Sequence, residues 1–152
     1  ARRLGARYVL TLDADGQHRF EDLPTVLAPL LAGTADLVIG SRRLGASVDA
    51  TLVRALGVRV FSALLTFLTR QRISDCASGL RGLQLERLGE LRLHQARHHT
   101  AELIIEAARR RLTIAEVPIT IVPRHTGHSK KGGSVGYALR FAGTIVTSWW
   151  RG

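Results

Sequence analysis

The chain has 152 residues, of which 45% are hydrophobic, and this predicts one globular domain with a real core and excludes a disordered chain. Its formal net charge of +10, carried mostly by arginine, indicates an anionic partner: a phosphate-bearing substrate, an anionic membrane or a nucleic acid. The single cysteine, Cys76, excludes an internal disulfide, fits a reducing compartment and is expected to be a small buried residue.

The first predicted strand, over 8–12, ends in two carboxylates. Because strand side chains alternate with period two, Asp13 and Asp15 are expected to point to the same side, and Gln17 continues that spacing into a glycine turn. Two carboxylates and an amide oxygen suit Mg2+ or Mn2+, with waters and the phosphates of a substrate completing the coordination. An acid-capped turn leading into the next helix is the structural alternative.

The remaining elements follow from hydrophobic periodicity and from helix breakers. Helices are predicted over 21–32, 50–70, 85–91, 98–111 and 134–150, and strands over 36–40, the last part of 73–83, and 112–123. The order strand, helix, strand over 8–40 predicts a parallel α/β unit. Pro118 predicts that its strand is irregular or lies at an edge of the sheet.

Two predicted helices combine apolar residues with arginines. The helix over 50–70 is expected either to be buried or to lie flat on an anionic membrane, and separate faces can serve the two purposes. The helix over 134–150 ends in Trp149 and Trp150 next to Arg151, which is typical of an interfacial helix because indole favours the headgroup level. Packing against a part of the protein outside this chain is the alternative. No run of about 18 uncharged apolar residues is present to span a bilayer.

Four sequence blocks occur in a fixed order: LTLDADGQH, DLVIGSR, SDCASGLRGL and AEVPITIVPRHTGHSKKGG. Together they resemble the catalytic half of the inverting family-2 glycosyltransferases of GT-A fold, in the branch of the dolichyl- or polyprenyl-phosphate sugar synthases. The similarity runs over roughly 8–133. It implies an α/β, GT-A-like (Rossmann-like) mixed sheet flanked by helices, with the amino-terminal nucleotide-binding strands missing.

The resemblance implies a role for several residues at the phosphates. Asp13, Asp15 and Gln17 match the family positions that hold a divalent metal. Through this metal the family binds the diphosphate of the sugar donor, here expected to be a UDP- or GDP-linked sugar. The positions that match basic residues near the donor or acceptor phosphates are Arg42, Arg54 and Arg124. Of these, Asp15, Arg42 and Arg124 are expected to act in catalysis.

Two further segments match the family. Ser129 and Lys130 match a G-x-S-K loop that closes over the site. Asp75, Ser78 and Arg81 match a D-x-x-S-G-x-R segment on the side of the acceptor. The resemblance therefore implies that these five residues lie near the acceptor or the phosphates.

The nature of the acceptor decides whether a general base is needed. A lipid monophosphate is largely ionised at pH 7, because its second pKa is about 6, and needs none. A hydroxyl acceptor needs one, and Glu102, near the start of the predicted helix over 98–111, is the candidate by position. A solvated first-turn carboxylate is the alternative that we favour for Glu102. His18 is expected near phosphates or solvent rather than on a metal.

The sequence departs from the family in two respects. Gly57 and Val58 stand where the family often has Ser or Asn one turn after the arginine that matches Arg54. The P-x-Y-N-E and D-D-G-S motifs, which bind the nucleotide base and ribose, do not occur in the sequence. The sequence also contains no methionine, even at position 1, and opens on ARRLGAR, which resembles the end of a helix. We therefore expect a segment of a longer protein.

These observations predict a partial catalytic domain over 1–133 and an amphipathic carboxyl-terminal helix over 134–152. The expected activity is metal-dependent, inverting transfer of a sugar to a polyprenyl phosphate at the cytoplasmic face of an anionic membrane, by a peripheral or tethered protein. A hydroxyl acceptor or a non-catalytic remnant are the alternatives. Nucleic-acid binding is not expected, because the arginines are scattered and aromatic residues make up only 5%. An aspartyl phosphotransferase does not fit Gly16 and Gln17 after the second aspartate.

Overall fold

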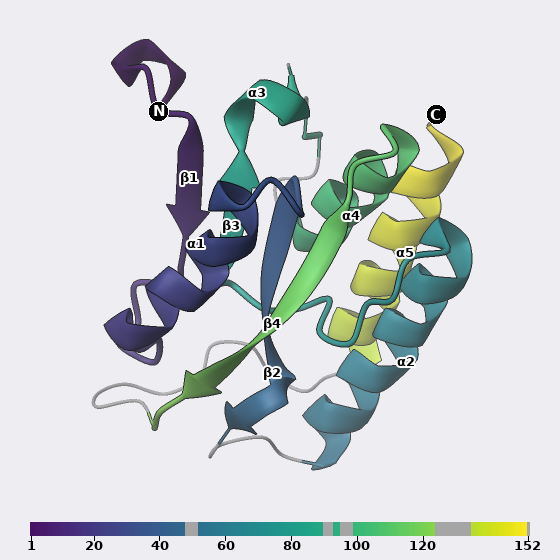
Figure 1. The fold of residues 1–152 in the computed structure, drawn as a ribbon. Coiled ribbons are helices and arrows are strands. Elements are labelled where there is room, and N and C mark those ends of the chain that lie inside the picture. The colour runs from purple at the N-terminus through teal and green to yellow at the C-terminus, as the bar shows by residue number, and fades with distance from the viewer. Residues whose placement is uncertain (48–51, 90–92, 95–98, 124–134, 152) are drawn as a thin grey trace.

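The computed structural model describes residues 1–47, 52–89, 93–94, 99–123 and 135–151, in which helices flank a four-stranded mixed sheet (Figure 1). The strands are β1 (Tyr8–Thr11), β2 (Leu37–Ser47), β3 (Arg81–Gln84) and β4 (Ile114–Ile121). The helices are α1 (Leu23–Leu31), α2 (Leu52–Thr69), α3 (Leu85–Leu88), α4 (His99–Arg109) and α5 (Val135–Trp150). Short 3-10 turns cover Arg2–Leu4 and Phe20–Asp22.

The sheet order is β1-β3-β2-β4, so the third strand along the chain lies between the first two. β3 is antiparallel to both of its neighbours, and β1 and β2 therefore run in the same direction without pairing. The predicted parallel unit over 8–40 is right in direction, and β3 lies between its two strands. β2 pairs in parallel with β4, which forms the other edge of the described sheet, as Pro118 predicted.

One face of the sheet is covered by α1. Val26 and Leu30 of this helix are fully buried and pack in one cluster with Val38 of β2 and Leu80. Because strand side chains alternate, the neighbours of Val38 along β2 point to the opposite face. The short helix that the sequence predicted over 21–32 therefore forms one outer layer of the fold.

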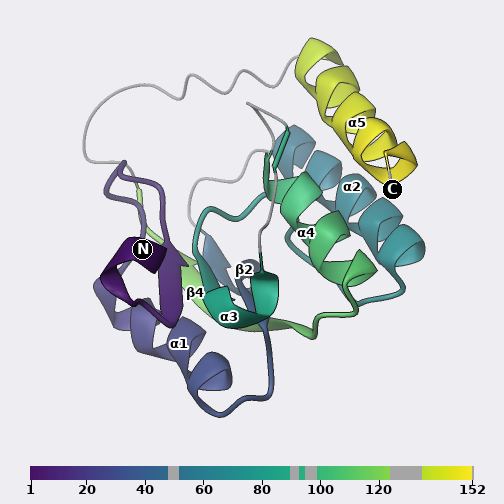
Figure 2. The same cartoon turned by 90° about the horizontal axis from the view of Figure 1, so that it is seen from above.

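The other face is covered by α4, with α2 and α5 packed against it (Figure 2). The cluster on this side contains Ile39 of β2, Ile104 of α4 and Ile145 of α5, each fully buried. The rings of Phe61 and Phe141 join α2 to α5 with their centroids 4.8 Å apart. Helix α5 thus shares a core with the rest of this chain, in addition to the two partners predicted for it, a membrane or a part of the protein outside this chain.

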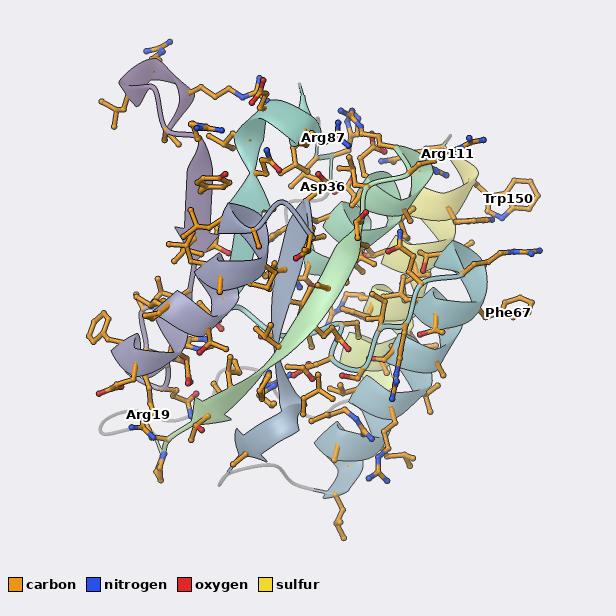
Figure 3. All side chains as sticks on the ribbon, in the orientation of Figure 1. Arg19, Asp36, Phe67, Arg87, Arg111 and Trp150 are labelled. Carbon is orange, nitrogen blue, oxygen red and sulfur yellow. The ribbon has the colours of Figure 1, made fainter. Side chains whose placement is uncertain are left out.

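Polar contacts fix the end of the sheet away from the carboxylates of β1. Asp36 precedes β2 and pairs with Arg87 of α3, with Oδ1 3.0 Å from Nε, and Figure 3 shows the two side chains side by side. The other oxygen, Oδ2, accepts the Thr113 amide at 2.9 Å just before β4. One carboxylate therefore joins three elements at this end and leaves the opposite end of the strands for the site.

Candidate active site

Asp13 and Asp15 follow the carboxyl end of β1, at the level of the middle of β2. Thr11 and Ile39 both pair with Arg81 of β3, so they lie at the same level on two strands that run in the same direction. Two residues further along, Asp13 therefore stands level with the Ser41–Arg42 segment of β2. This places the predicted metal carboxylates and the first predicted phosphate-binding arginine at one end of the sheet.

The Asp13 carboxylate lies directly against the backbone of Gly79. A Cβ atom added at Gly79 would stand 2.7 Å from Cγ and from Oδ2 of Asp13, closer than side chains approach one another. Thr11 Oγ1 also donates to the carbonyl oxygen of Gly79 at 3.3 Å. The end of β1 thus packs against the backbone just before β3. Only glycine at position 79 leaves room for the Asp13 carboxylate.

Gln17 joins the turn after the carboxylates to the end of β4. Its backbone amide donates to Asp15 Oδ1 at 3.3 Å, and its side-chain Nε2 donates to the carbonyl of Val122 at 3.2 Å. The Val122 amide donates in turn to the Gln17 carbonyl at 3.1 Å. The side-chain amide oxygen is the atom with which Gln17 could bind a metal.

Arg42 and Asp75 form a bidentate ion pair. Arg42 Nε donates to Oδ2 and Nη2 donates to Oδ1, both at 2.6 Å, and the Arg42 backbone amide also donates to Oδ2 at 3.1 Å. The side chain of Asp75 is 0% exposed and that of Arg42 is 17% exposed. Burial acts to lower the pKa of Arg42, but the hydrogen bonds and charge of Asp75 outweigh it and raise that pKa above its ordinary value.

The loop that carries Asp75, over 74–78, is held by acceptors from three directions. Glu116 of β4 accepts the amides of Ser74 and Asp75, and the hydroxyl of Ser62 in α2 accepts the amide of Cys76 at 3.0 Å. Asp75 Oδ1 accepts the amide of Ala77 at 3.3 Å. Because its backbone donors have fixed acceptors, the loop is a rigid platform for the ion pair.

Arg81 and Ser78, which the resemblance placed on the acceptor side, are buried. Nη1 of Arg81 donates to the carbonyl of Thr100 and Nη2 donates to the carbonyl of Cys76, both at 3.2 Å. Burial lowers the pKa of Arg81 to about 10, so it stays protonated at neutral pH. Arg81 Nε and Ser78 Oγ have no hydrogen-bond partner among the described residues.

His18 lies beside the two carboxylates and forms an isolated bridge with Ile121 at the end of β4. Burial lowers its pKa below the ordinary value, and nearby Arg42 acts in the same direction, while the negative charges of Asp13 and Asp15 oppose the shift. His18 is thus half-buried beside the two carboxylates, where burial favours its neutral form. Its proximity to a phosphate stays a prediction.

Glu102 is buried rather than solvated, so that prediction is wrong. It is 6% exposed, and its Oε1 accepts the backbone amide of His94 at 2.8 Å. It lines a cavity of about 180 Å³ between α4 and α5 together with Glu106 and Ser148. Helix position alone misled the prediction, because it does not show that the backbone of His94, outside α4, donates to the carboxylate.

Four predicted residues have no described side chain. Arg54 lies in the first turn of α2, but its side chain is outside the described part of the structure. Arg124, Ser129 and Lys130 also fall outside the described residues. Their roles stay predictions.

The arrangement fits a divalent metal in its choice of donors. Asp13 and Asp15 supply hard carboxylate oxygens next to a glycine cradle, and Gln17 could add its amide oxygen. Within the described ranges, no group of three or more His, Cys, Asp and Glu side chains could hold a metal. Such a site could hold Mg2+ or Mn2+ through few protein ligands, with phosphate oxygens and waters as the others.

Two structural features of the site escaped sequence reasoning. Glu116 occurs inside a family-like block but was given no role, and Gly79, which beside Arg81 predicted a close approach of the backbone to another group, was given no partner. A lone carboxylate in an otherwise apolar strand was the available signal for Glu116, because a buried charge requires partners. The contact of Gly79 with Asp13 joins residues far apart in the chain and has no local signal.

Known proteins are similar to this chain in sequence. Residues 1–91 match the family model described as glycosyl transferase family 2. An undecaprenyl-phosphate mannosyltransferase of Micrococcus luteus is 33% identical over 95% of this chain and 60% of its own length. A UDP-N-acetylglucosamine–dolichyl-phosphate N-acetylglucosaminyltransferase of Methanococcus voltae is 32% identical over 88% of this chain and 55% of its own length.

A dolichyl-phosphate hexose transferase of Haloferax volcanii is 36% identical over 73% of this chain and 48% of its own length. The chain thus spans about half the length of the curated relatives that it matches. The family match covers more than half of the chain, and the mixed sheet with helices on both faces is GT-A-like, as the resemblance implied. The chain therefore belongs to glycosyl transferase family 2.

Proposed function

We propose that the protein transfers a sugar from a nucleotide diphosphate donor to a polyprenyl phosphate, with inversion at the anomeric carbon. The observation that carries the proposal is the placement of Asp13 and Asp15 level with the ion-paired Arg42 at one end of the sheet. Two carboxylates for a metal and a fixed guanidinium for a phosphate are what a diphosphate leaving group needs. The relatives are named for transfer to dolichyl or undecaprenyl phosphate, and this supports a lipid phosphate as acceptor.

Asp13 and Asp15 would hold Mg2+ or Mn2+ together with Gln17. When bound, the cation supplies positive charge that stabilises the departing nucleoside diphosphate. Arg42 adds hydrogen bonds to phosphate oxygens from its outward edge, because Asp75 holds its Nε and Nη2 and leaves Nη1 as the nitrogen directed elsewhere. A phosphate acceptor is an anion at neutral pH, so no residue has to remove a proton from it.

Peripheral contact with an anionic membrane is part of the proposal, because it brings the protein to its lipid acceptor. Helices α2 and α5 contact one another, and their exposed large apolar side chains are here called the α2–α5 face: Leu52, Val53, Leu56, Val60, Phe67, Leu139, Val146, Trp149 and Trp150. Figure 3 shows Phe67 and Trp150 pointing away from the sheet on the same side. None of the helices in the described part of the chain is long and apolar enough to cross a bilayer.

Titration calorimetry of the protein expressed from its complete coding sequence tests the donor site. We expect UDP- or GDP-linked sugars to bind only when Mn2+ is present, and Asp15→Asn to abolish that binding. Glu86→Gln, which changes a carboxylate in the exposed first turn of α3, is the control and should bind as the wild type does. Mn2+-dependent transfer that survives in Asp15→Asn would overturn the metal site.

A hydroxyl acceptor is the alternative, and Glu102 discriminates between the two. Gln keeps an oxygen that can accept the His94 amide, so Glu102→Gln is expected to fold normally while losing a general base. Transfer to polyprenyl phosphate should be unchanged in this variant. If the wild type transfers sugar to a hydroxyl acceptor and not to polyprenyl phosphate, and Glu102→Gln greatly lowers the kcat of that transfer, the hydroxyl alternative with Glu102 as its base is favoured.

A further inference from the structure

Glu116 stands in the middle of β4 and binds the backbone of a distant loop. It pairs in register with Ile39 of β2, and its side chain reaches across to the loop over 74–78. Oε1 accepts the amides of Ser74 and Asp75 at 2.9 and 3.0 Å, and Oε2 accepts the Ser74 amide at 2.8 Å. These are charge-assisted hydrogen bonds, which are shorter and stronger than those between neutral groups.

The loop transmits this contact to the candidate active site. The two residues that Glu116 holds by their backbone include Asp75, whose side chain makes the bidentate pair with Arg42. Ser74 adds a second link, since its hydroxyl lies 2.7 Å from that of Ser41, the residue before Arg42 in β2. The position of the Arg42 guanidinium therefore depends on the position of the loop.

A buried guanidinium holds the same loop from another side. Arg81 donates to the Cys76 carbonyl, also in this loop, so Arg81 and the Glu116 carboxylate both fix its backbone. Burial acts to lower the pKa of both Arg42 and Arg81 and the charge of Asp75 acts to raise it, so the placement of this loop decides where that charge stands. Removing the Glu116 carboxylate would leave the amides of Ser74 and Asp75 without an acceptor.

We propose that Glu116 is a positioning residue that acts on phosphate binding through the loop over 74–78, Asp75 and Arg42. The inference rests on the proposed function, in which Arg42 contacts phosphate. The local sequence around Glu116, in the E-V-P segment, does not indicate this role, because Glu116 and Arg42 lie far apart along the chain.

The experiment compares Glu116→Met with Glu116→Gln in the protein expressed from its complete coding sequence. Met has a similar length but no oxygen acceptor, whereas the Gln oxygen can still accept both amides. We expect Glu116→Met to lower kcat/KM for sugar transfer about tenfold and to speed hydrogen exchange in the peptide over 73–79. Glu116→Gln should restore most of both properties. Glu106→Met, which removes a half-buried carboxylate from α4, is the control and should change neither.

A second background separates positioning from general destabilisation. In the Arg42→Lys variant, which cannot make the bidentate pair, we expect Glu116→Met to lower kcat/KM by less than about twofold. Equal losses in the wild-type and Arg42→Lys backgrounds, or unchanged loop exchange in Glu116→Met, would overturn the positioning role. If Arg42→Lys alone leaves transfer unchanged, the proposed role of Arg42 fails, and this inference fails with it. If Arg42→Lys lowers transfer but Glu116→Met does not, only this inference fails.

Discussion

Arg42 and Asp75 hold each other through two hydrogen bonds of 2.6 Å, although 33 residues separate them in the sequence. The resemblance assigned Arg42 to the phosphates and Asp75 to the acceptor. Both carboxylate oxygens of Asp75 accept hydrogen bonds from Arg42, and Oδ1 also accepts the amide of Ala77. In the structure, Asp75 therefore orients Arg42. A direct contact between Asp75 and an acceptor stays a prediction.

The first prediction concerns the energy of this pair. Asp75→Asn removes the ion-pair partner of the largely buried Arg42, so we expect the free energy of unfolding to fall by about 3 kcal/mol. Glu106→Gln breaks the more exposed Glu106–Arg110 pair and should lower it by only about 0.5 kcal/mol. Chemical denaturation measures both. Equal losses in the free energy of unfolding for the two substitutions would show that the buried Arg42–Asp75 pair stabilises the fold no more than the exposed pair does.

The second prediction concerns the glycine cradle. In Gly79→Ala the new methyl group meets the Asp13 carboxylate at 2.7 Å, so the carboxylate must move. We expect the affinity for Mn2+, measured by titration in the presence of a nucleotide sugar, to fall at least about tenfold. Gly143→Ala is the matched control, because its methyl group meets nothing within 4 Å, and it should stabilise α5 slightly. Unchanged Mn2+ affinity in Gly79→Ala would contradict a metal role for Asp13.

The third prediction concerns the α2–α5 face. Phe67 and Trp150 are 81% and 84% exposed, and replacing either with Ser removes apolar area available to a membrane. Partition into vesicles that contain anionic lipid should fall about tenfold for the double variant. Phe20→Ser removes a similarly exposed ring, at 76%, that lies before α1, and should leave partition unchanged. If Phe20→Ser weakened partition as much, the membrane contact would not be specific to the α2–α5 face.

The fourth prediction concerns pH and Cys76. Burial raises the pKa of its thiol from 9.0 to about 11 in the folded protein, so between these values the unfolded chain loses the proton first. Folding stability contributed by Cys76 is therefore complete below pH 9 and is lost as the pH rises. The stability difference between the wild type and Cys76→Ala should shrink by about 1 kcal/mol from about pH 8 to about pH 10. Parallel pH profiles for the two proteins would contradict a raised pKa.

The sequence by itself determined the elements and the family. Hydrophobic periodicity located the strand before Asp13, the helix over 23–31 and the helix over 99–109 within a few residues, because local side-chain spacing encodes local backbone structure. Cys76 was correctly predicted to be buried. The ordered blocks identified the glycosyltransferase family, and the match of residues 1–91 to the family model confirms it.

Only the tertiary structure decided how distant segments meet. The insertion of β3 between β1 and β2, the burial of Glu102 and the contact of Gly79 with Asp13 all join residues far apart in the chain. The same holds for the contacts of Glu116 and Asp75 that fix Arg42. Local sequence patterns do not predict these pairings. The pairings form only when helices pack on both faces of the sheet and each buried charge pairs with a group from a distant part of the chain.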